Sequence, residues 1–117
     1  MANKDQNLTL NEGNTEKVNL TIVTNDPVPN TPMLLDQLTD IEVLLKPSEI
    51  TPDSDASVWR GKMSDGDVVI TDAGAGKCYV KIPASAVTTT RQFWRVDTVS
   101  GSERKTAGGG TVTVVDW

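Results

Sequence analysis

The chain has 117 residues, a formal net charge of −5, no histidine and a single cysteine. This length corresponds to one domain that can bury its own core. The missing histidine excludes the usual catalytic triads and most zinc sites, and the acidic balance argues against nucleic acid as a partner. No apolar run approaches the ~20 residues of a membrane span, so we expect no membrane partner.

The N-terminal part of the chain is polar as far as residue 16, and it contains no apolar stretch typical of a signal peptide. We therefore expect synthesis in a cytoplasm, and an arm over 1–16 that is mobile or ordered by a partner. The first strand is expected over 17–23. There Val18, Leu20 and Ile22 alternate with polar residues, which is the period of a half-buried strand.

A loop with three prolines covers 25–32, and the sequence predicts short helical turns over 33–38 and 83–90. Six further β-like runs are each bounded by turn residues. They cover 40–46, 57–63, 68–71, 77–82, 92–99 and 111–115. The resulting expectation is all-β: an immunoglobulin-like antiparallel β-sandwich of about seven strands over 17–117, preceded by the N-terminal arm.

In the run 40–46, Ile41, Val43 and Leu45 share one face, and Leu44 is an exception on the other. The glycines at 108–110 are too few for a linker between domains. They are expected to let the chain cross a sheet end or bulge into the last strand.

Two Asp-x-Asp pairs are the best candidates for metal ligands: Asp53 with Asp55, and Asp65 with Asp67. A calcium loop of the EF-hand type that begins at Asp53 needs Gly at its sixth position and Glu at its twelfth, and both are missing. Solubility at turns and strand edges explains both pairs better. We expect no catalytic, metal or cofactor site, and therefore no enzyme.

The run from Gly74 to Lys77 has the glycines and lysine of a phosphate loop, but the required earlier glycine and the following Ser or Thr are absent. A hairpin turn is the better interpretation. Cys78 shares a strand face with Val80 and Ile82 and is expected to be a small buried hydrophobe.

Three tryptophans remain to be placed. Trp59 and Trp94 lie in predicted strands and are expected in or near the core. Trp117 lies outside every predicted strand, so we expect it to dock on its own domain or on a partner. A sugar-binding surface would also use exposed tryptophan, but usually together with more aromatic residues than the 4 % found here.

The charge is uneven along the chain. Residues 1–57 carry three basic and ten acidic side chains, whereas 58–117 carry eight basic and six acidic ones. This is compatible with chance, because strands from both halves interleave in a sandwich. It also fits an acidic patch that meets a basic patch on a neighbouring copy.

Several short motifs occur in a fixed order between residues 8 and 115. They are Gly13-Asn14-Thr15, Pro27-Val28-Pro29, Leu38-Thr39-Asp40-Ile41, Gly66-Asp67-Val68-Val69-Ile70, Ala75-Gly76-Lys77, Ile82-Pro83, Phe93-Trp94-Arg95-Val96-Asp97 and Gly110-Thr111-Val112-Thr113-Val114. Their order resembles the immunoglobulin-like module at the N-terminus of upper baseplate proteins of phages of Gram-positive bacteria, and of related short phage proteins. The chain departs from that pattern at Arg91-Gln92, where the family usually has a glycine.

The resemblance implies a non-catalytic structural protein of a tailed-phage virion. It would be an accessory subunit that decorates the capsid or joins the tail or baseplate. Its partners would be capsid, tail or baseplate subunits and further copies of itself, with contacts repeated by symmetry. The alternative is a carbohydrate-binding module that attaches the virion to a host cell surface.

Overall fold

A computed structural model describes residues 3–4, 7–12, 14–24, 31–32 and 34–115. In this part of the chain the eleven strands are distributed over two main sheets and one small sheet. The strands are β1 Asn3–Lys4, β2 Leu8–Asn11, β3 Glu16–Thr21, β4 Val23–Thr24, β5 Thr31–Pro32, β6 Asp40–Lys46, β7 Trp59–Lys62, β8 Val68–Asp72, β9 Lys77–Ile82, β10 Phe93–Ser100 and β11 Glu103–Val115. None of the described helices is long and apolar enough to cross a bilayer.

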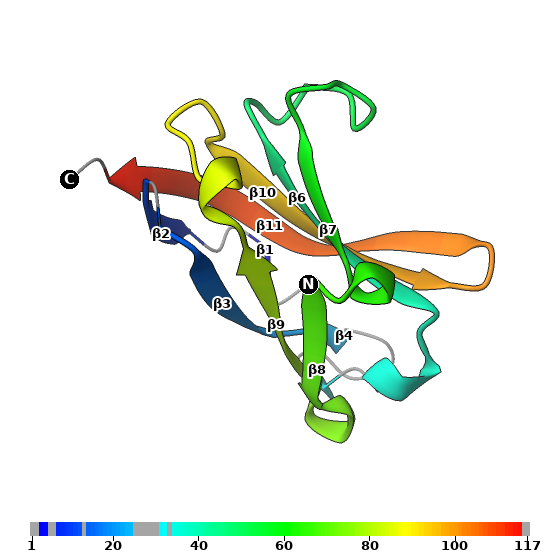
Figure 1. Cartoon of the computed structure of the whole chain (residues 1–117). Coiled ribbons are helices and arrows are strands. Elements are labelled where there is room, and N and C mark those ends of the chain that lie inside the picture. The colour runs from blue at the N-terminus through cyan, green and yellow to red at the C-terminus, as the bar shows by residue number, and fades with distance from the viewer. Residues whose placement is uncertain (1–2, 5–6, 13, 25–30, 33, 116–117) are drawn as a thin grey trace.

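The larger sheet has the order β1-β11-β10-β6-β7, and β2 pairs with the C-terminal part of β11. The second sheet has the order β3-β9-β8, and β4 pairs with β5. In an immunoglobulin domain of the variable type these two sheets correspond to strands G-F-C-C′ and B-E-D. Figure 1 shows the two sheets facing each other, with the long β10–β11 hairpin extending along the molecule. The chain is an immunoglobulin-like β-sandwich, as predicted.

The core lies between the sheets, where alternate residues of each strand meet. Its buried apolar side chains are Leu8, Leu10, Leu20, Ile22, Leu35, Ile41, Val43, Leu45, Val68, Cys78, Val80, Ile82, Ala86, Val87, Trp94, Val96, Ala107 and Val112. Burial of one such aliphatic side chain contributes about 1.5–3 kcal/mol, so this set is the main source of stability.

Within the described ranges, four 3₁₀ turns join the strands: Leu35–Gln37, Met63–Asp65, Ala73–Ala75 and Ala84–Ala86. The first and last fall where the sequence predicts helical turns. The third leads through Gly76, whose φ of +70° is a left-handed conformation suited to glycine, into β9. Residues 74–77 therefore belong to the turn of the antiparallel β8–β9 hairpin, as expected.

The N-terminal part of the chain differs from the prediction. β2 pairs in parallel with β11, from Leu8 opposite Val112 to Asn11 opposite Val115, and β1 pairs with β11 at Gly108 and Gly109. Leu8 and Leu10 are buried in the core. The expected polar arm over 1–16 is therefore wrong for these residues, because an alternation of only two leucines is too short to recognise as a strand.

The last strand begins at Glu103, eight residues before the predicted start. Residues 103–106 lack an apolar alternation because the tip of the β10–β11 hairpin pairs beyond the core. The register shifts between Val96, opposite Gly108, and Asp97, opposite Thr106. Ala107 is thus the extra residue of a β-bulge, which confirms the bulge predicted next to the glycines.

Candidate functional site

The outer face of the larger sheet carries charged side chains on its central strands. In β6, Ile41, Val43 and Leu45 point into the core, so Glu42 and Lys46 lie on the opposite face. In β10 the same alternation turns Arg95 and Asp97 outward, and the strand register places Asp97 opposite Glu42. Side chains of opposite charge from two strands are therefore neighbours.

We call the resulting cluster the charge network. It contains three carboxylates and four cations: Glu42, Asp53, Asp97, Lys46, Arg60, Arg95 and Arg104. Glu42, Lys46 and Asp97 are almost entirely buried, although they lie outside the apolar core. A buried charge is tolerated only when opposite charges and hydrogen bonds replace water.

Asp97 is the centre of the network. Its carboxylate accepts hydrogen bonds from Arg95 through Nε and Nη2, each at 2.9 Å, and from Arg104 Nη1 at 3.3 Å. The hydroxyl of Thr106 donates a fourth at 3.1 Å. These four donors replace the water that a carboxylate only 1 % exposed loses in the sheet face.

A second carboxylate fixes the loop between β6 and β7 to this face. Asp53 in that loop accepts two hydrogen bonds from the Arg95 guanidinium, and Lys46 Nζ lies 2.9 Å from its Oδ1. The hydrogen bonds from Arg95 and then from Lys46 lower the pKa of Asp53 to about 2. The same bonds, with those to Asp97, raise the pKa of Arg95 above its ordinary value. Arg95 thus joins loop and sheet.

Glu42 lies at the other end of the network. Its Oε2 accepts a hydrogen bond from Arg104, and this bond raises the arginine's pKa. Its Oε1 lies 3.3 Å from Arg60 Nε, but the two atoms do not have hydrogen-bond geometry. Among the described residues this buried oxygen therefore has an ionic neighbour and no hydrogen-bond donor. It has capacity for one further donor.

The charge network also explains Leu44, the apolar residue on the outer face. It is fully buried yet does not belong to the core between the sheets. The register places Arg95 on one side of it and Arg60 on the other. Aliphatic stems of arginines at such neighbouring positions cover apolar surface while their guanidinium groups reach carboxylates.

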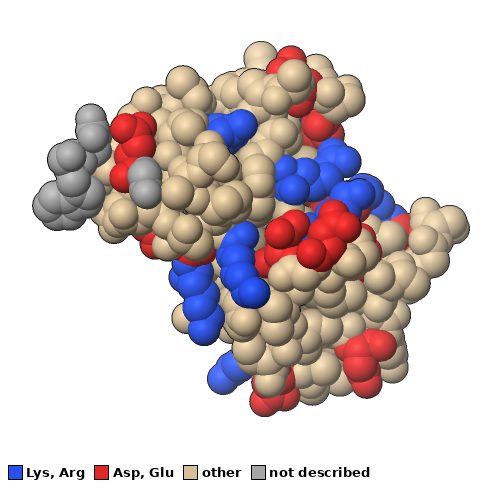
Figure 2. Space-filling model, in the orientation of Figure 1, with Lys and Arg blue, Asp and Glu red and all other residues tan. Residues whose placement is uncertain are grey.

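The acidic and basic side chains of the network are paired with one another. Its carboxylates are held by guanidinium groups, and the described residues contain no group of three or more side chains suited to a metal ion. Arg60 and Arg104 keep about a third and a half of their side chains exposed. Figure 2 shows basic and acidic atoms mixed over the visible face rather than separated into broad areas of one sign. The arrangement presents a pre-ordered polar surface.

The low pKa of Asp53 predicts a specific acid sensitivity. Its folded-state pKa of about 2 lies below the ordinary 3.8, so the folded chain binds this proton less readily than the unfolded chain. The resulting stabilisation is complete above about pH 5 and is lost as the pH falls through 2. Asp53→Asn should therefore flatten the fall in urea midpoint between pH 5 and pH 2. The control is Asp65→Asn, because Asp65 is an exposed aspartate in a turn. This variant should show the same fall in urea midpoint as the unmodified chain.

The two Asp-x-Asp pairs do not come together as ligand sets. Asp53 belongs to the charge network, a role that the sequence interpretation missed. Asp55 accepts hydrogen bonds from the hydroxyl and the backbone N–H of Ser57, which lower its pKa. Asp67 accepts from the backbone N–H of Lys62, and Asp65 is exposed in its turn. These contacts are local.

Cys78 is 2 % exposed, and burial raises its thiol pKa to about 11, so the prediction of a small buried hydrophobe is confirmed. Trp94 lies in the core and Trp59 packs against it half-buried, also as predicted. Asp116 and Trp117 lie outside the described residues.

Comparison with known proteins adds a structural resemblance. No family model matches the sequence, and no curated protein matches it. The extracellular portion of mouse CD200RLa is similar in structure, with a TM-score of 0.43 and 11 % sequence identity. The match covers 96 % of this chain and 56 % of that one, so the chain spans little more than half the length of the structure it matches.

Proposed function

We propose that the chain is a non-catalytic structural subunit of a tailed-phage virion, which binds capsid, tail or baseplate proteins through its surface. The supporting observation is where the shared motifs fall in the fold. Gly66 and Gly76 adopt positive φ values of 84° and 70° at the ends of their turns, and Ile82 closes β9 before Pro83. Three of the motifs that carry the phage resemblance thus fall at turns and strand ends of an immunoglobulin-like sandwich, while 93–97 and 110–114 lie within β10 and β11.

The charge network supplies a surface suited to such contacts. The guanidinium groups of Arg95 and Arg104 are each held by two carboxylates, so a partner binds them without first ordering flexible side chains. Polar, pre-ordered surfaces favour specificity of contact and register. The proposed location is therefore the virion, with synthesis in the cytoplasm of the host bacterium.

The carbohydrate-binding alternative predicts an exposed tryptophan ring. Trp94 is 3 % exposed and Trp59 packs against the core, so neither offers a flat platform for a sugar. That alternative then depends on Trp117, which lies outside the described residues. No specific observation favours it.

The test is association with particles. Tailed particles are purified by density gradient from the bacterium that carries the gene, washed at high salt, and probed with an antibody against the chain. We expect the chain in the particle fraction, with gold-labelled antibody at one position on the virion. Its absence from particles would contradict the proposal. A glycan array should show no binding, whereas saturable binding to a host polysaccharide would favour the alternative.

A further inference from the structure

Among the described residues, the C-terminal part of β11 has one edge without a neighbouring strand. The β10–β11 pairing ends with Phe93 opposite Thr111, followed by one hydrogen bond of 2.6 Å from the Val112 N–H to the Gln92 carbonyl. Beyond this point β11 pairs with β2 on its other side. In the described part of the chain, no strand lies on the β10 side of residues 113–115.

The backbone of Val114 points toward that open side. Val112 directs its N–H to the β10 side, and the Val115 carbonyl accepts from the Glu12 N–H, 2.9 Å away, on the β2 side. Successive residues of a strand direct their N–H and C=O groups to alternate sides. The N–H and C=O of Val114 therefore face the space where β10 has ended, as an unpaired strand edge does.

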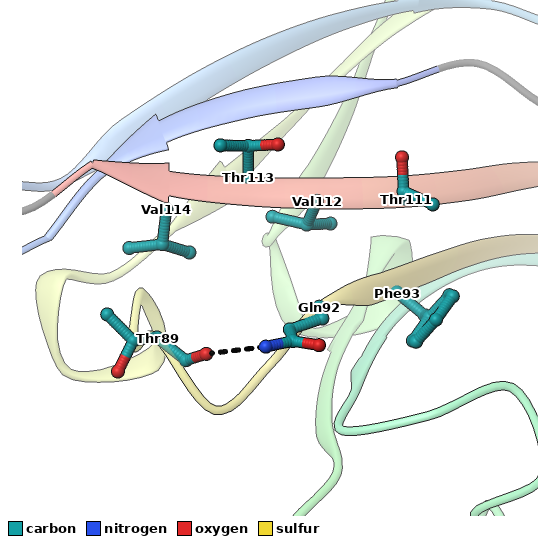
Figure 3. A pocket seen from close by; sticks show the side chains of 7 residues that line it. All are labelled: Thr89, Gln92, Phe93, Thr111, Val112, Thr113 and Val114. Carbon is teal, nitrogen blue, oxygen red and sulfur yellow. Dashed lines mark hydrogen bonds between the residues drawn. The ribbon is translucent and has the colours of Figure 1, made fainter.

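A surface pocket of about 400 Å³ adjoins this edge. In Figure 3, Val114 and Thr89 face each other across it, and Val112 lies beside them. Its lining has methyl, phenyl, hydroxyl and amide groups and no charged side chain: Thr89, Gln92, Phe93, Thr111, Val112, Thr113 and Val114. A neutral pocket beside an open strand edge suits an extended segment that brings an apolar side chain.

We propose that the occupant is the same strand of a second copy of this chain. The two β11 ends would run antiparallel about a twofold axis, with the N–H and C=O groups of the two Val114 residues bonded to each other. Asp116 and Trp117 follow β11 in the sequence and would bring the indole of each copy to the pocket of the other. The interface is isologous and closes as a dimer, and this inference does not depend on the proposed virion role.

Three observations favour a second copy over another partner. The open edge is self-complementary, because Val114 offers both a donor and an acceptor. The pocket contains no charge for a strongly charged partner to recognise. A tryptophan, which buries a large area at low entropic cost, follows the same strand three residues after Val114. Because the contact is small, the dimer is expected to be weak.

Sedimentation velocity of the purified full chain, at concentrations up to about 1 mM, measures the dimer directly. We expect a monomer–dimer equilibrium in the unmodified chain. Val114→Pro removes an N–H that points away from β2, so it should abolish the dimer and keep the β2–β11 pairing. Because the Val114 side chain packs against the core, the melting temperature should fall, but less than in Thr113→Pro. Thr113→Pro removes an N–H that faces β2 and should lower the melting temperature. Trp117→Ala should weaken dimerisation at least tenfold.

Disulfide trapping provides a second test that does not require the proline variant to fold. Val114→Cys should form a disulfide-linked dimer under mild oxidation. The exposed control Ser102→Cys, in the turn just before β11, should not form one. Cys78 is buried, so the unmodified chain should stay free of cross-links.

Three results would each overturn the proposal. The first is an unmodified chain that stays monomeric throughout the concentration series. The second is a folded Val114→Pro variant that dimerises like the unmodified chain, and the third is equal trapping at the two cysteine positions. A monomeric chain whose folded Val114→Pro variant no longer associates with particles would show that the edge binds another protein instead.

Discussion

Asp97→Asn is expected to lower the free energy of unfolding by about 3 kcal/mol, because it removes the central charge of a buried ion-pair network. The carboxylate is 1 % exposed and accepts four hydrogen bonds, three of them from Arg95 and Arg104. An asparagine keeps the shape but loses the charge, and its NH₂ group then faces other donors. The loss stays near the lower end of the range for broken buried pairs, because both arginines keep a second carboxylate partner.

Asp53→Asn is the matched comparison for Asp97→Asn. Both aspartates accept two hydrogen bonds from Arg95, but the Asp53 side chain is 38 % exposed. Solvent screens the exposed pair, so this variant should lose less than about 1 kcal/mol at pH 7. Urea unfolding at pH 7 measures both. Equal losses, or a loss below about 1 kcal/mol for Asp97→Asn, would show that burial does not set the strength of the network.

Gly109→Ala is expected to destabilise the fold by about 2 kcal/mol or more, through backbone crowding inside the larger sheet. A Cβ at this position would lie 2.5 Å from the carbonyl oxygen of Trp94 and 3.3 Å from Arg95 Cα. These atoms belong to the β10 backbone, on one side of β11, while β1 pairs with Gly109 on the other. No flexible side chain can yield, so β10 and β11 must separate.

Gly74→Ala tests whether that loss is specific. Gly74 lies in the turn between β8 and β9, and an added Cβ there would meet its nearest atom at 3.8 Å, an ordinary contact. The change should stay within about 0.5 kcal/mol of the unmodified chain. Thermal unfolding followed by circular dichroism compares the two variants. If both behave alike, the close approach at Gly109 does not limit stability.

The strands that alternate apolar and polar residues could be predicted from the sequence. The expected run 77–82 coincides with β9, and 40–46 coincides with β6. In a strand with one face in the core, apolar and polar residues alternate, so the strand can be recognised from its own sequence. The turns marked by glycine could be predicted for a similar reason, because the ability to adopt a positive φ is a property of glycine itself.

β2 and the long β11 could not be predicted in the same way. Leu8 and Leu10 form too short an alternation to stand out, and their partners lie about a hundred residues later in the chain. The tip of β11 is polar because it pairs only within its own hairpin. In both cases pairing with a distant or adjacent strand, rather than local composition, makes the segment a strand.

The charge network separates what the sequence determines from what the tertiary structure decides. The sequence places charges on the outward-facing positions of β6 and β10, and Leu44 among them is a local sign that this face is covered. The sequence does not show that Asp53, 42 residues before Arg95, folds onto it, or that Arg104 reaches Glu42 across 62 residues. Local periodicity assigns a side chain to a face, whereas only strand order, register and loop path bring opposite charges within bonding distance.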